Sequence, residues 1–343
     1  MLRLEAIDRI RSQPGRAVLL YLTDRCPVGC AHCSVSALPR GPRPDLTLVG
    51  RLVDELCARD QLRLAGISGG EPFAERRALE LATTRLAAAG KQLVLYTSGN
   101  WGRDDGTVPG WTRAVLARAS CAVLSTDRYH AARIPGPRYQ AALRATAEAG
   151  AWIAVQVIGT PAQLAEAERL LAAALGPSWP DHAEIRATPL LPRGRAARPD
   201  RETGSGRPAA PAASGLPGRP GYTAGRCSLA RTPVVRYDGR VTGCCNEDVV
   251  TGAGPDALHA RADGPRELPA VLDALARDPF LAAVTAFGPA ALTRLPRYRD
   301  LGAQAHPDIC AACWALLDRG ADSDPAVRAL ALLGAGRLDG NSR

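Results

Sequence analysis

The sequence predicts an α/β fold built on a parallel sheet, followed by a smaller second region. Six short apolar runs alternate with helical patterns over the first two hundred residues, and a Pro- and Gly-rich segment then separates them from the rest of the chain. The chain has 343 residues, of which 46% are hydrophobic and only 4% aromatic. It can therefore bury a large core made mainly of Ala, Leu and Val.

The expected strands are rich in β-branched and other apolar residues, and five of the six end at a polar residue or a glycine. They cover residues 17–24, 64–69, 92–100, 121–127, 152–159 and 183–191. Between them, residues 46–60 repeat apolar side chains at the spacing of one buried helix face, and 75–90 and 138–150 end at glycines that can cap a helix. A strand and a helix repeated six times predict parallel strands joined by crossover helices.

The second region has a different pattern. Residues 192–226 are poor in large apolar side chains and rich in Pro and Gly, which predicts a linker or loop. Residues 233–245 read as a hairpin whose turn is Asp238–Gly239, a favoured turn pair. Helical patterns follow over about 266–294.

Charge and hydropathy argue against two classes of partner. The formal net charge of +9 is carried almost entirely by arginines, which are scattered rather than clustered on one face with aromatic residues. This pattern argues against nucleic-acid binding. No apolar run approaches the roughly 18 residues of a membrane span, and the N-terminus lacks the apolar core of a signal peptide. We therefore expect a cytoplasmic protein without a membrane partner.

Ten cysteines in such a compartment favour metal or catalytic roles over disulfides. Cys26, Cys30 and Cys33 follow the first expected strand directly. A structural zinc site needs four ligands, and His32 is adjacent to Cys33, so the two cannot both turn toward one tetrahedral ion without strain. Three thiolates on a [4Fe-4S] cluster would instead leave one iron open for a small ligand.

The Cys-x3-Cys-x2-Cys spacing after the first strand resembles the cluster motif of radical S-adenosylmethionine (SAM) enzymes. The resemblance extends over residues 15–200 to "GGEP" after the second strand, "TSGN" after the third and "STD" after the fourth. It implies a partial (β/α)6 TIM barrel in which Cys26, Cys30 and Cys33 hold a [4Fe-4S] cluster. It also implies a set of SAM contacts: Gly69, Gly70, Glu71, Pro72, Ser98, Asn100, Ser125 and Asp127. Taken singly, these motifs also fit a glycine turn or, at Asp127, a helix N-cap.

Five further cysteines lie beyond the linker. Their spacing resembles the twitch domain, the short form of the SPASM domain, which holds one auxiliary [4Fe-4S] cluster. The resemblance implies four ligands, Cys227, Cys244, Cys310 and Cys313, in a small α+β domain. The expected domain limits are 15–200 for the barrel, 201–225 for the linker, 226–320 for the twitch-like domain and 321–343 for a C-terminal tail. Cys244 is preferred over Cys245 because it completes a Gly-x4-Cys pattern, and a four-cysteine zinc site stays an alternative.

The resemblance implies cleavage of SAM to a 5'-deoxyadenosyl radical that removes a hydrogen atom from a small-molecule substrate. It also implies an external one-electron donor of the flavodoxin or ferredoxin type. A fully ligated auxiliary cluster can accept an electron, which favours oxidation of a hydroxyl to a ketone, as in dehydrogenases of aminocyclitol and aminosugar intermediates in antibiotic pathways.

Three alternatives remain. Epimerisation of an aminoglycoside needs a free thiol near the substrate, and the spare member of Cys244 and Cys245 is the candidate. Crosslinking of a ribosomally made precursor peptide is disfavoured because the first motif begins at residue 26, without room for a leader-binding domain before it. A plain iron-sulfur electron carrier would not need the "GGEP" and "STD" positions.

Three residues are candidates for contact with the substrate. Glu247 could bind a cationic amine, although solvated loop acids are common. Arg186, on the sixth strand, could orient a hydroxyl or pair with an acid. His130 could move protons near neutral pH or serve only the structure.

Overall fold

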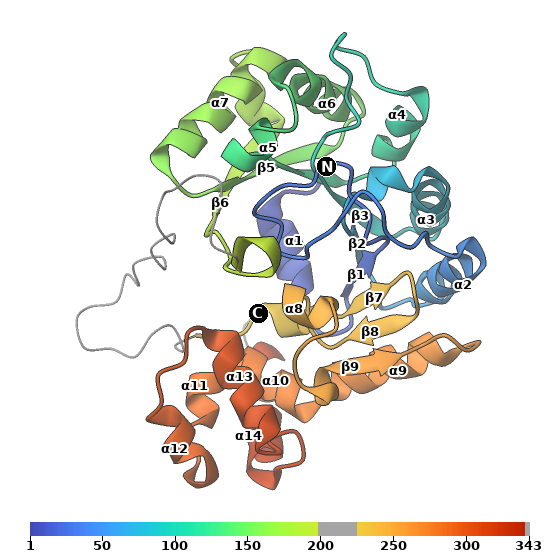
Figure 1. The fold of residues 1–343 in the computed structure, drawn as a ribbon. Helices are drawn as coiled ribbons and strands as arrows, with labels where there is room; N and C mark the ends of the chain where they lie inside the picture. The colour runs from blue at the N-terminus through green and yellow to red at the C-terminus, as the bar shows by residue number, and fades with distance from the viewer. Residues whose placement is uncertain (198–224, 340–343) are drawn as a thin grey trace.

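The structure, a computed structural model, describes residues 1–197 and 225–339. Figure 1 shows a curved sheet with helices on its outer side and a group of C-terminal helices next to its β7–β9 end. The nine strands lie in the order β6-β5-β4-β3-β2-β1-β7-β8-β9.

Six parallel strands form the larger part of the sheet, in sequence order from β1 to β6. They are β1 (Ala17–Tyr21), β2 (Leu64–Ser68), β3 (Gln92–Thr97), β4 (Cys121–Ser125), β5 (Trp152–Ile158) and β6 (Ala183–Thr188). This order confirms the predicted α/β class and is that of a partial (β/α)6 TIM barrel. Their carboxyl ends carry the loops in which the expected motifs lie.

Helices connect consecutive strands on the outer face. They are α2 (Leu46–Cys57), α3 (Arg76–Ala88), α4 (Gly110–Leu116), α5 (Arg128–Ala131), α6 (Gly136–Glu148) and α7 (Pro161–Leu175). In α2, Val49, Leu52, Val53 and Leu56 are fully buried, as the apolar spacing predicts, and the Asp45 carboxylate caps the helix by accepting from the Thr47 N–H.

The N-terminal helix α1 (Leu4–Arg11) closes the other end of the barrel. Ile7 is buried in one cluster with inward-facing strand residues such as Val94 and Trp152. One carboxylate oxygen of Glu184 on β6 accepts hydrogen bonds from the Leu4 N–H and the Trp152 indole N–H, at 2.8 and 2.6 Å. Helix α1 therefore forms the floor of the space inside the strands.

The C-terminal region continues the same sheet. Strand β7 (Val234–Arg236) pairs with β1 in parallel, and β8 (Arg240–Thr242) and β9 (His259–Arg261) follow antiparallel. The predicted hairpin turn is present, and Gly239 takes φ +81°, a conformation that favours glycine. The region that contains the later cysteines is thus attached to the barrel through β1.

Helices complete this region around Phe280, Tyr298 and Leu316. They are α8 (Glu247–Val250), α9 (Glu267–Arg277), α10 (Pro279–Ala286), α11 (Pro289–Leu292), α12 (Arg299–Gly302), α13 (Ile309–Asp318) and α14 (Pro325–Asp339). The 3-10 turns are η1 (Pro72–Ala74), η2 (Trp179–Asp181), η3 (Gly194–Ala197), η4 (Leu229–Arg231), η5 (Asp256–Leu258) and η6 (Pro296–Tyr298).

Helix α14 lies in the segment expected as a C-terminal tail, and its Val327 and Ala331 are buried in one cluster with Phe280 of α10. The expected linker 201–225 lies outside the described residues except for Gly225.

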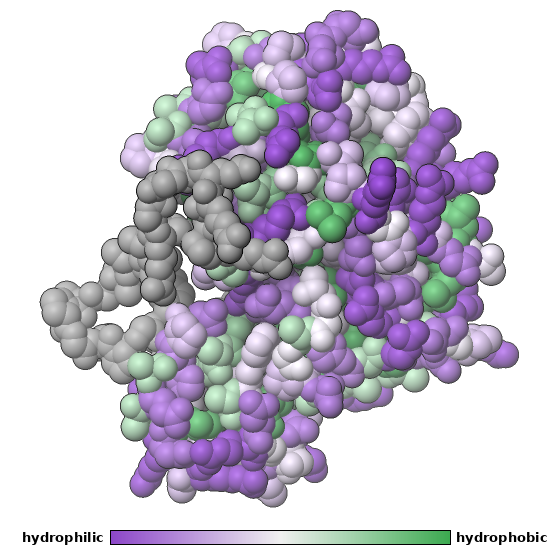
Figure 2. All heavy atoms as spheres, in the orientation of Figure 1, coloured by the Kyte–Doolittle hydropathy of each residue, from purple (hydrophilic) through white to green (hydrophobic). Residues whose placement is uncertain are grey.

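On the face shown in Figure 2, hydrophilic residues predominate and apolar residues occur in small separate patches. Among the described residues, no helix has the length and apolarity that crossing a bilayer requires.

Candidate functional site

The first three cysteines lie on the loop between β1 and α2. Cys26 and Cys30 are buried, and Cys33 is half-buried. The Cys26 N–H donates to the Leu38 carbonyl at 2.9 Å, which closes the loop on itself. Burial, with a smaller contribution from the Glu71 charge, raises the pKa of the Cys26 thiol to about 11. Such a thiol becomes a thiolate at neutral pH when a metal replaces its proton.

The glycines of "GGEP" pass directly against this loop. The Gly70 and Glu71 N–H groups donate to the carbonyls of Thr23 and Arg25, at 2.7 and 2.8 Å. A Cβ atom on Gly70 would collide with the Arg25 carbonyl group. Only glycine allows this approach of the two backbones, so the second motif fixes the position of the cysteine loop.

The carboxylate of Glu71 joins the motifs after β2 and β3. It accepts from the Thr97 hydroxyl and the Ser98 N–H, both at 2.8 Å, and from the Ser98 hydroxyl and the Phe73 N–H. Burial raises the pKa of Glu71, against the effect of these hydrogen bonds. Glu71, expected as a SAM contact, thus has both oxygens engaged by donors of its own chain.

Asn100 and Ser98 lie together after β3. The Asn100 N–H lies 3.4 Å from the Ser98 hydroxyl, and its side-chain oxygen lies 3.4 Å from a nitrogen of Arg138. The two residues expected to contact SAM are therefore neighbours at the carboxyl end of the sheet, on the same side as the cysteine loop.

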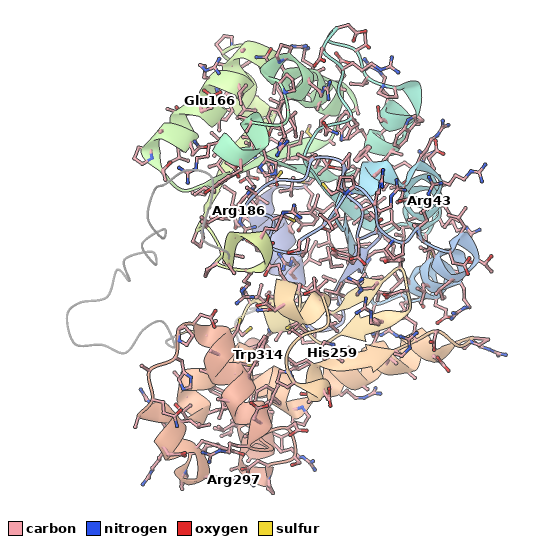
Figure 3. All side chains as sticks on the ribbon, viewed as in Figure 1. Arg43, Glu166, Arg186, His259, Arg297 and Trp314 are labelled. Atoms are coloured by element: carbon pink, nitrogen blue, oxygen red, sulfur yellow. The ribbon has the colours of Figure 1, made fainter. Side chains whose placement is uncertain are left out.

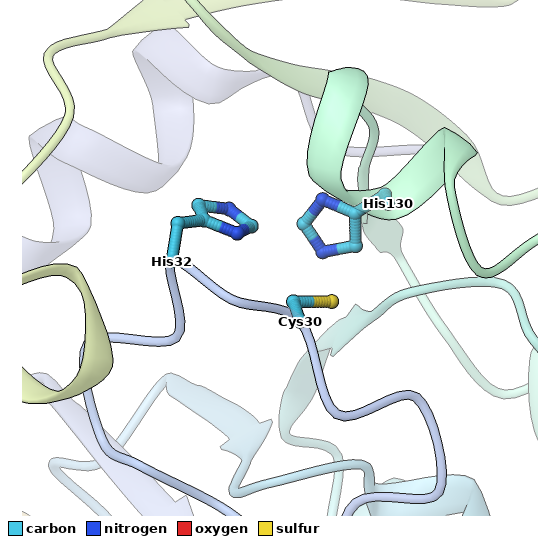
Figure 4. A group of neighbouring side chains, drawn as sticks. All are labelled: Cys30, His32 and His130. Atoms are coloured by element: carbon cyan, nitrogen blue, oxygen red, sulfur yellow. The ribbon is translucent and has the colours of Figure 1, made fainter. Parts of the chain in front are cut away.

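Two histidines, His32 and His130, lie beside Cys30 (Figure 4), and both contact the carboxylate of Asp127. One oxygen of Asp127 caps α5 by accepting from the Tyr129 and His130 N–H groups. The other lies 3.0 Å from Nε2 of His32 and 3.1 Å from Nδ1 of His130. The helix-cap alternative for Asp127 is therefore realised in the structure, and its carboxylate also holds both imidazoles.

The two histidines are close enough to Cys30 to share an ion with it. The ligand atoms of Cys30, His32 and His130 all lie within 4.8 Å of one another. Burial opposes the charge of His130, but hydrogen bonds to Asp127 and Cys30 outweigh it and raise the pKa to about 10. His32 was not expected as a partner of Asp127, although its place between Cys30 and Cys33 was an available signal.

Ser125 and Arg186 lie at one level inside the barrel. Ser125 pairs with Gln156, and Gln156 pairs with Arg186, so the three side chains share a face of the sheet. An Arg186 guanidinium nitrogen lies 4.0 Å from the carboxylate of Asp8 on α1, and Figure 3 shows Arg186 near that helix. Arg186 therefore points into the barrel, above its floor.

Four of the later cysteines line one small cavity: Cys227, Cys244, Cys310 and Cys313. Cys310 and Cys313 lie three residues apart at the start of α13, so they share one face of the helix. Burial raises the pKa of Cys313 well above its ordinary value, and the neighbouring thiols raise it further. Four sulfur donors fit an iron-sulfur cluster or zinc.

Cys245 lies apart from these four. A guanidinium nitrogen of Arg11, at the end of α1, donates to its sulfur at 3.5 Å. Burial raises the pKa of the Cys245 thiol to about 11, against the opposing effect of Arg11. Of the two other cysteines, Cys121 is buried inside the barrel and Cys57 is half-buried on α2.

The carboxylate of Glu247 is paired with an arginine. This carboxylate lies 3.4 Å from a guanidinium nitrogen of Arg193, and Asp248 and Asp308 lie 3.5 and 3.1 Å from the same guanidinium. Burial raises the pKa of Glu247, and Arg193 opposes that rise. Three carboxylates thus surround one arginine between the barrel and the four-cysteine cavity.

Comparison with known proteins agrees with this geometry. The family model described as the radical SAM superfamily matches residues 20–159. The crystal structure of Streptococcus suis SuiB bound to S-adenosylmethionine matches with a TM-score of 0.51 and 13% identity, over 80% of this chain and 68% of SuiB. This likeness shows a shared fold.

BtrN in complex with AdoMet and 2-DOIA matches with a TM-score of 0.44 and 11% identity, over 84% of this chain and 90% of BtrN. No curated protein sequence matches this one.

Proposed function

We propose that this chain, which belongs to the radical SAM superfamily, oxidises a hydroxyl of a small amine-bearing molecule to a ketone. Aminocyclitol and aminosugar intermediates of natural products are the proposed substrate class. The observation that carries the proposal is the set of four cysteines that converge in a region joined to the barrel through the pairing of β7 with β1. Such a set leaves a bound cluster without an open position, so that it can exchange electrons without binding substrate.

The residues of both sites fit the groups that the family uses. Cys26, Cys30 and Cys33 offer three sulfur donors at the carboxyl end of the barrel, and the glycines of the second motif lie against their loop. When bound, SAM with a [4Fe-4S] cluster on these cysteines supplies the radical that removes hydrogen, and a second [4Fe-4S] cluster supplies an electron acceptor.

The proposed reaction removes two hydrogens from the substrate. The carbon that bears the hydroxyl would lose a hydrogen atom and then one electron, which a cluster held by the four cysteines would accept, and the hydroxyl would release its proton to water. An external one-electron donor of the flavodoxin or ferredoxin type starts each turnover. The C–O single bond becomes a C=O double bond, and no oxygen is added.

The charges between the two sites favour a cationic substrate. Three carboxylates face the single guanidinium of Arg193, and the side chains of Glu247, Asp248 and Asp308 are 28, 36 and 42% exposed. Their excess negative charge attracts an ammonium group even though the whole chain is basic, because nearby charges dominate over net charge. Glu247, the most buried of the three, is the proposed contact for the amine.

The proposal is tested with anaerobically reconstituted protein, a reductant, SAM and a panel of aminocyclitols and aminosugars. We expect a product lighter than the substrate by two hydrogen atoms. Cys313→Ala should still form deoxyadenosine and should lose the ketone, because it removes only a ligand of the second site. Products of unchanged mass throughout the panel, with deoxyadenosine formed, would contradict oxidation.

Epimerisation is a second candidate, and the position of Cys245 favours it. Its thiol is outside the four-cysteine set and lies against Arg11 on the barrel floor, so it is free to return a hydrogen atom to a substrate radical. In deuterated water this reaction would place one deuterium on the product, because thiol hydrogens exchange with solvent. Cys245→Ala should abolish that deuterium if epimerisation occurs, and should leave a ketone product unchanged if oxidation occurs.

A further inference from the structure

Three consecutive residues, Arg193, Gly194 and Arg195, contact both cysteine sites. They follow β6, and Gly194 and Arg195 begin η3, just before the first residues outside the described part of the chain. The two arginine side chains bind different partners. Neither arginine belongs to the motifs expected to bind SAM or a cluster.

Arg195 holds the cysteine loop. Its Nε donates to the Cys30 carbonyl at 2.8 Å, and its Nη1 donates to the Ala37 carbonyl at 2.7 Å. Its own N–H donates to the Cys33 carbonyl at 3.0 Å. One guanidinium therefore bridges two points of the loop that lie seven residues apart, which restricts how the loop can move.

Gly194 allows the close approach that these hydrogen bonds need. It takes φ +54°, and a Cβ atom there would collide with the carbonyl oxygens of Cys33 and Ser34. Any other residue would push the segment away from the loop, in addition to the strain of its backbone conformation.

Arg193 reaches the other site. Its side chain is only 11% exposed and contacts Glu247, Asp248 and Asp308. Burial opposes its charge, but a hydrogen bond to Cys310 and the nearby carboxylates outweigh burial and raise its pKa. Cys310 also accepts a hydrogen bond from the Asn246 side-chain amide at 3.1 Å. The Asn246 amide thus donates to the Cys310 sulfur, and the Arg193 guanidinium lies close by, since it contacts Asp308 two residues before Cys310.

We propose that residues 193–195 act as a brace that fixes the Cys26–Cys33 loop relative to the four-cysteine site, with Arg193 as a positioning residue of the latter. The proposal rests on the proposed function, because it needs a redox group at each site. A permanent positive charge next to Cys310 stabilises the more negative, reduced form of a cluster and so raises its reduction potential. The same segment keeps the two sites in one fixed arrangement.

The test uses the full chain with both sites reconstituted. Iron is counted first, and the two reduced clusters are then followed by electron paramagnetic resonance during a redox titration. The cluster on the first loop is identified by the change in its signal when SAM is added. The variants are Arg193→Gln, Arg193→Lys and Gly194→Ala, and the matched control is Arg169→Gln, which removes an exposed arginine paired with Glu166 on α7.

We expect Arg193→Gln to shift the midpoint potential of the SAM-insensitive signal to a more negative value and to leave the other signal unchanged. Arg193→Lys, which keeps the charge, should shift it less, and Arg169→Gln should shift neither. Gly194→Ala should alter the SAM-sensitive signal, because it displaces the segment from Cys33.

The outcomes separate the brace from the function. About eight irons per chain, with the potentials of Arg193→Gln equal to those of Arg169→Gln, would overturn the brace and leave the function standing. About four irons per chain in the wild type would mean that the second cluster is absent, and this result would overturn both the brace and the proposed function. If Arg193→Gln does not fold, Arg193→Lys and Gly194→Ala carry the test, and wild-type signals in both would overturn it.

Discussion

Arg11 donates a hydrogen bond to the sulfur of Cys245 at 3.5 Å, whereas Cys244, its neighbour in sequence, lines the four-cysteine cavity. The two adjacent thiols therefore lie in different surroundings. The chain bends at Gly243 and Cys244, directly after β8, so this dipeptide can direct its two thiols to different surroundings. The relationship makes these two cysteines a matched pair for experiment.

The first prediction compares Cys244→Ala with Cys245→Ala. Cys244→Ala should lower the iron content from about eight to about four per chain, because a cube that lacks one of its four ligands is lost more readily. Cys245→Ala should keep about eight irons per chain. Iron and sulfide analysis after anaerobic reconstitution measures both. The reverse result would show that Cys245 is the ligand and that the cavity is wrongly assigned.

A second prediction concerns the contact between Gly70 and the cysteine loop. Gly70→Ala should prevent the first cluster from binding SAM. The added Cβ would meet the Arg25 carbonyl group, which cannot move without shifting Cys26. Gly110→Ala is the control, since nothing lies near a Cβ at that position. SAM-dependent change of the cluster spectrum is the measurement. A wild-type response in Gly70→Ala would show that the loop can adjust.

The sequence predicted the features that local patterns determine. The six strands, the helix faces and the turn at Gly239 follow from periodicity and turn chemistry, and the structure has them all. Strand ends were less accurate. For example, β1 ends at Tyr21 and not at residue 24, because the chain turns there into the cysteine loop. A helical signal at Pro325 was also overlooked, although the Asp324 carboxylate accepts from the Ala326 N–H just before α14.

Contacts between distant parts of the chain could not be predicted. Nothing local to Arg193 indicates that Glu247 and Asp308 lie beside it, since they are 54 and 115 residues away along the chain. The role of α1 as the floor of the barrel depends in the same way on Glu184. Such partners are brought together only by the fold. The role of the cysteines could therefore be inferred from the sequence, whereas the polar side chains around them could not.

A third prediction concerns Arg236, which is 1% exposed although it is charged. It donates to the carboxylate of Asp24 at 2.7 Å and lies over the ring of Tyr21 at 4.7 Å, so it ties β7 to the cysteine loop. Arg236→Met should lower the free energy of unfolding by about 3 kcal/mol, because Asp24 loses its charged partner.

The control for Arg236 is Arg240→Gln, which removes a partly exposed arginine paired with Asp238. It should cost less than about 1 kcal/mol, since water screens such pairs. Denaturant unfolding of the reconstituted proteins compares the two. Equal losses in both variants would mean that the burial of Arg236 has no energetic consequence.

A fourth prediction concerns Tyr298, which is fully buried and donates to the carboxylate of Asp324 at 2.6 Å. This bond joins η6 to the start of α14. Tyr298→Phe should cost about 2 kcal/mol, the value of a hydrogen bond to a charged group. A double-mutant cycle with Asp324→Asn isolates the bond, because only the pair term survives the subtraction. A coupling energy of zero would show that the contact contributes nothing to the folded state.

The same tyrosine predicts how this contribution depends on pH. Burial, together with the hydrogen bond to Asp324, raises the pKa of Tyr298 to about 12. In the unfolded chain the phenol ionises near pH 10, so its contribution to stability is complete below about pH 10 and is lost as the pH rises toward 12. The stability difference between wild type and Tyr298→Phe should therefore narrow between pH 9 and pH 11. Unfolding midpoints at the two pH values measure it. A difference that stays constant would mean that the pKa of Tyr298 is the same in the folded and unfolded protein, and one that widens would mean that folding lowers this pKa.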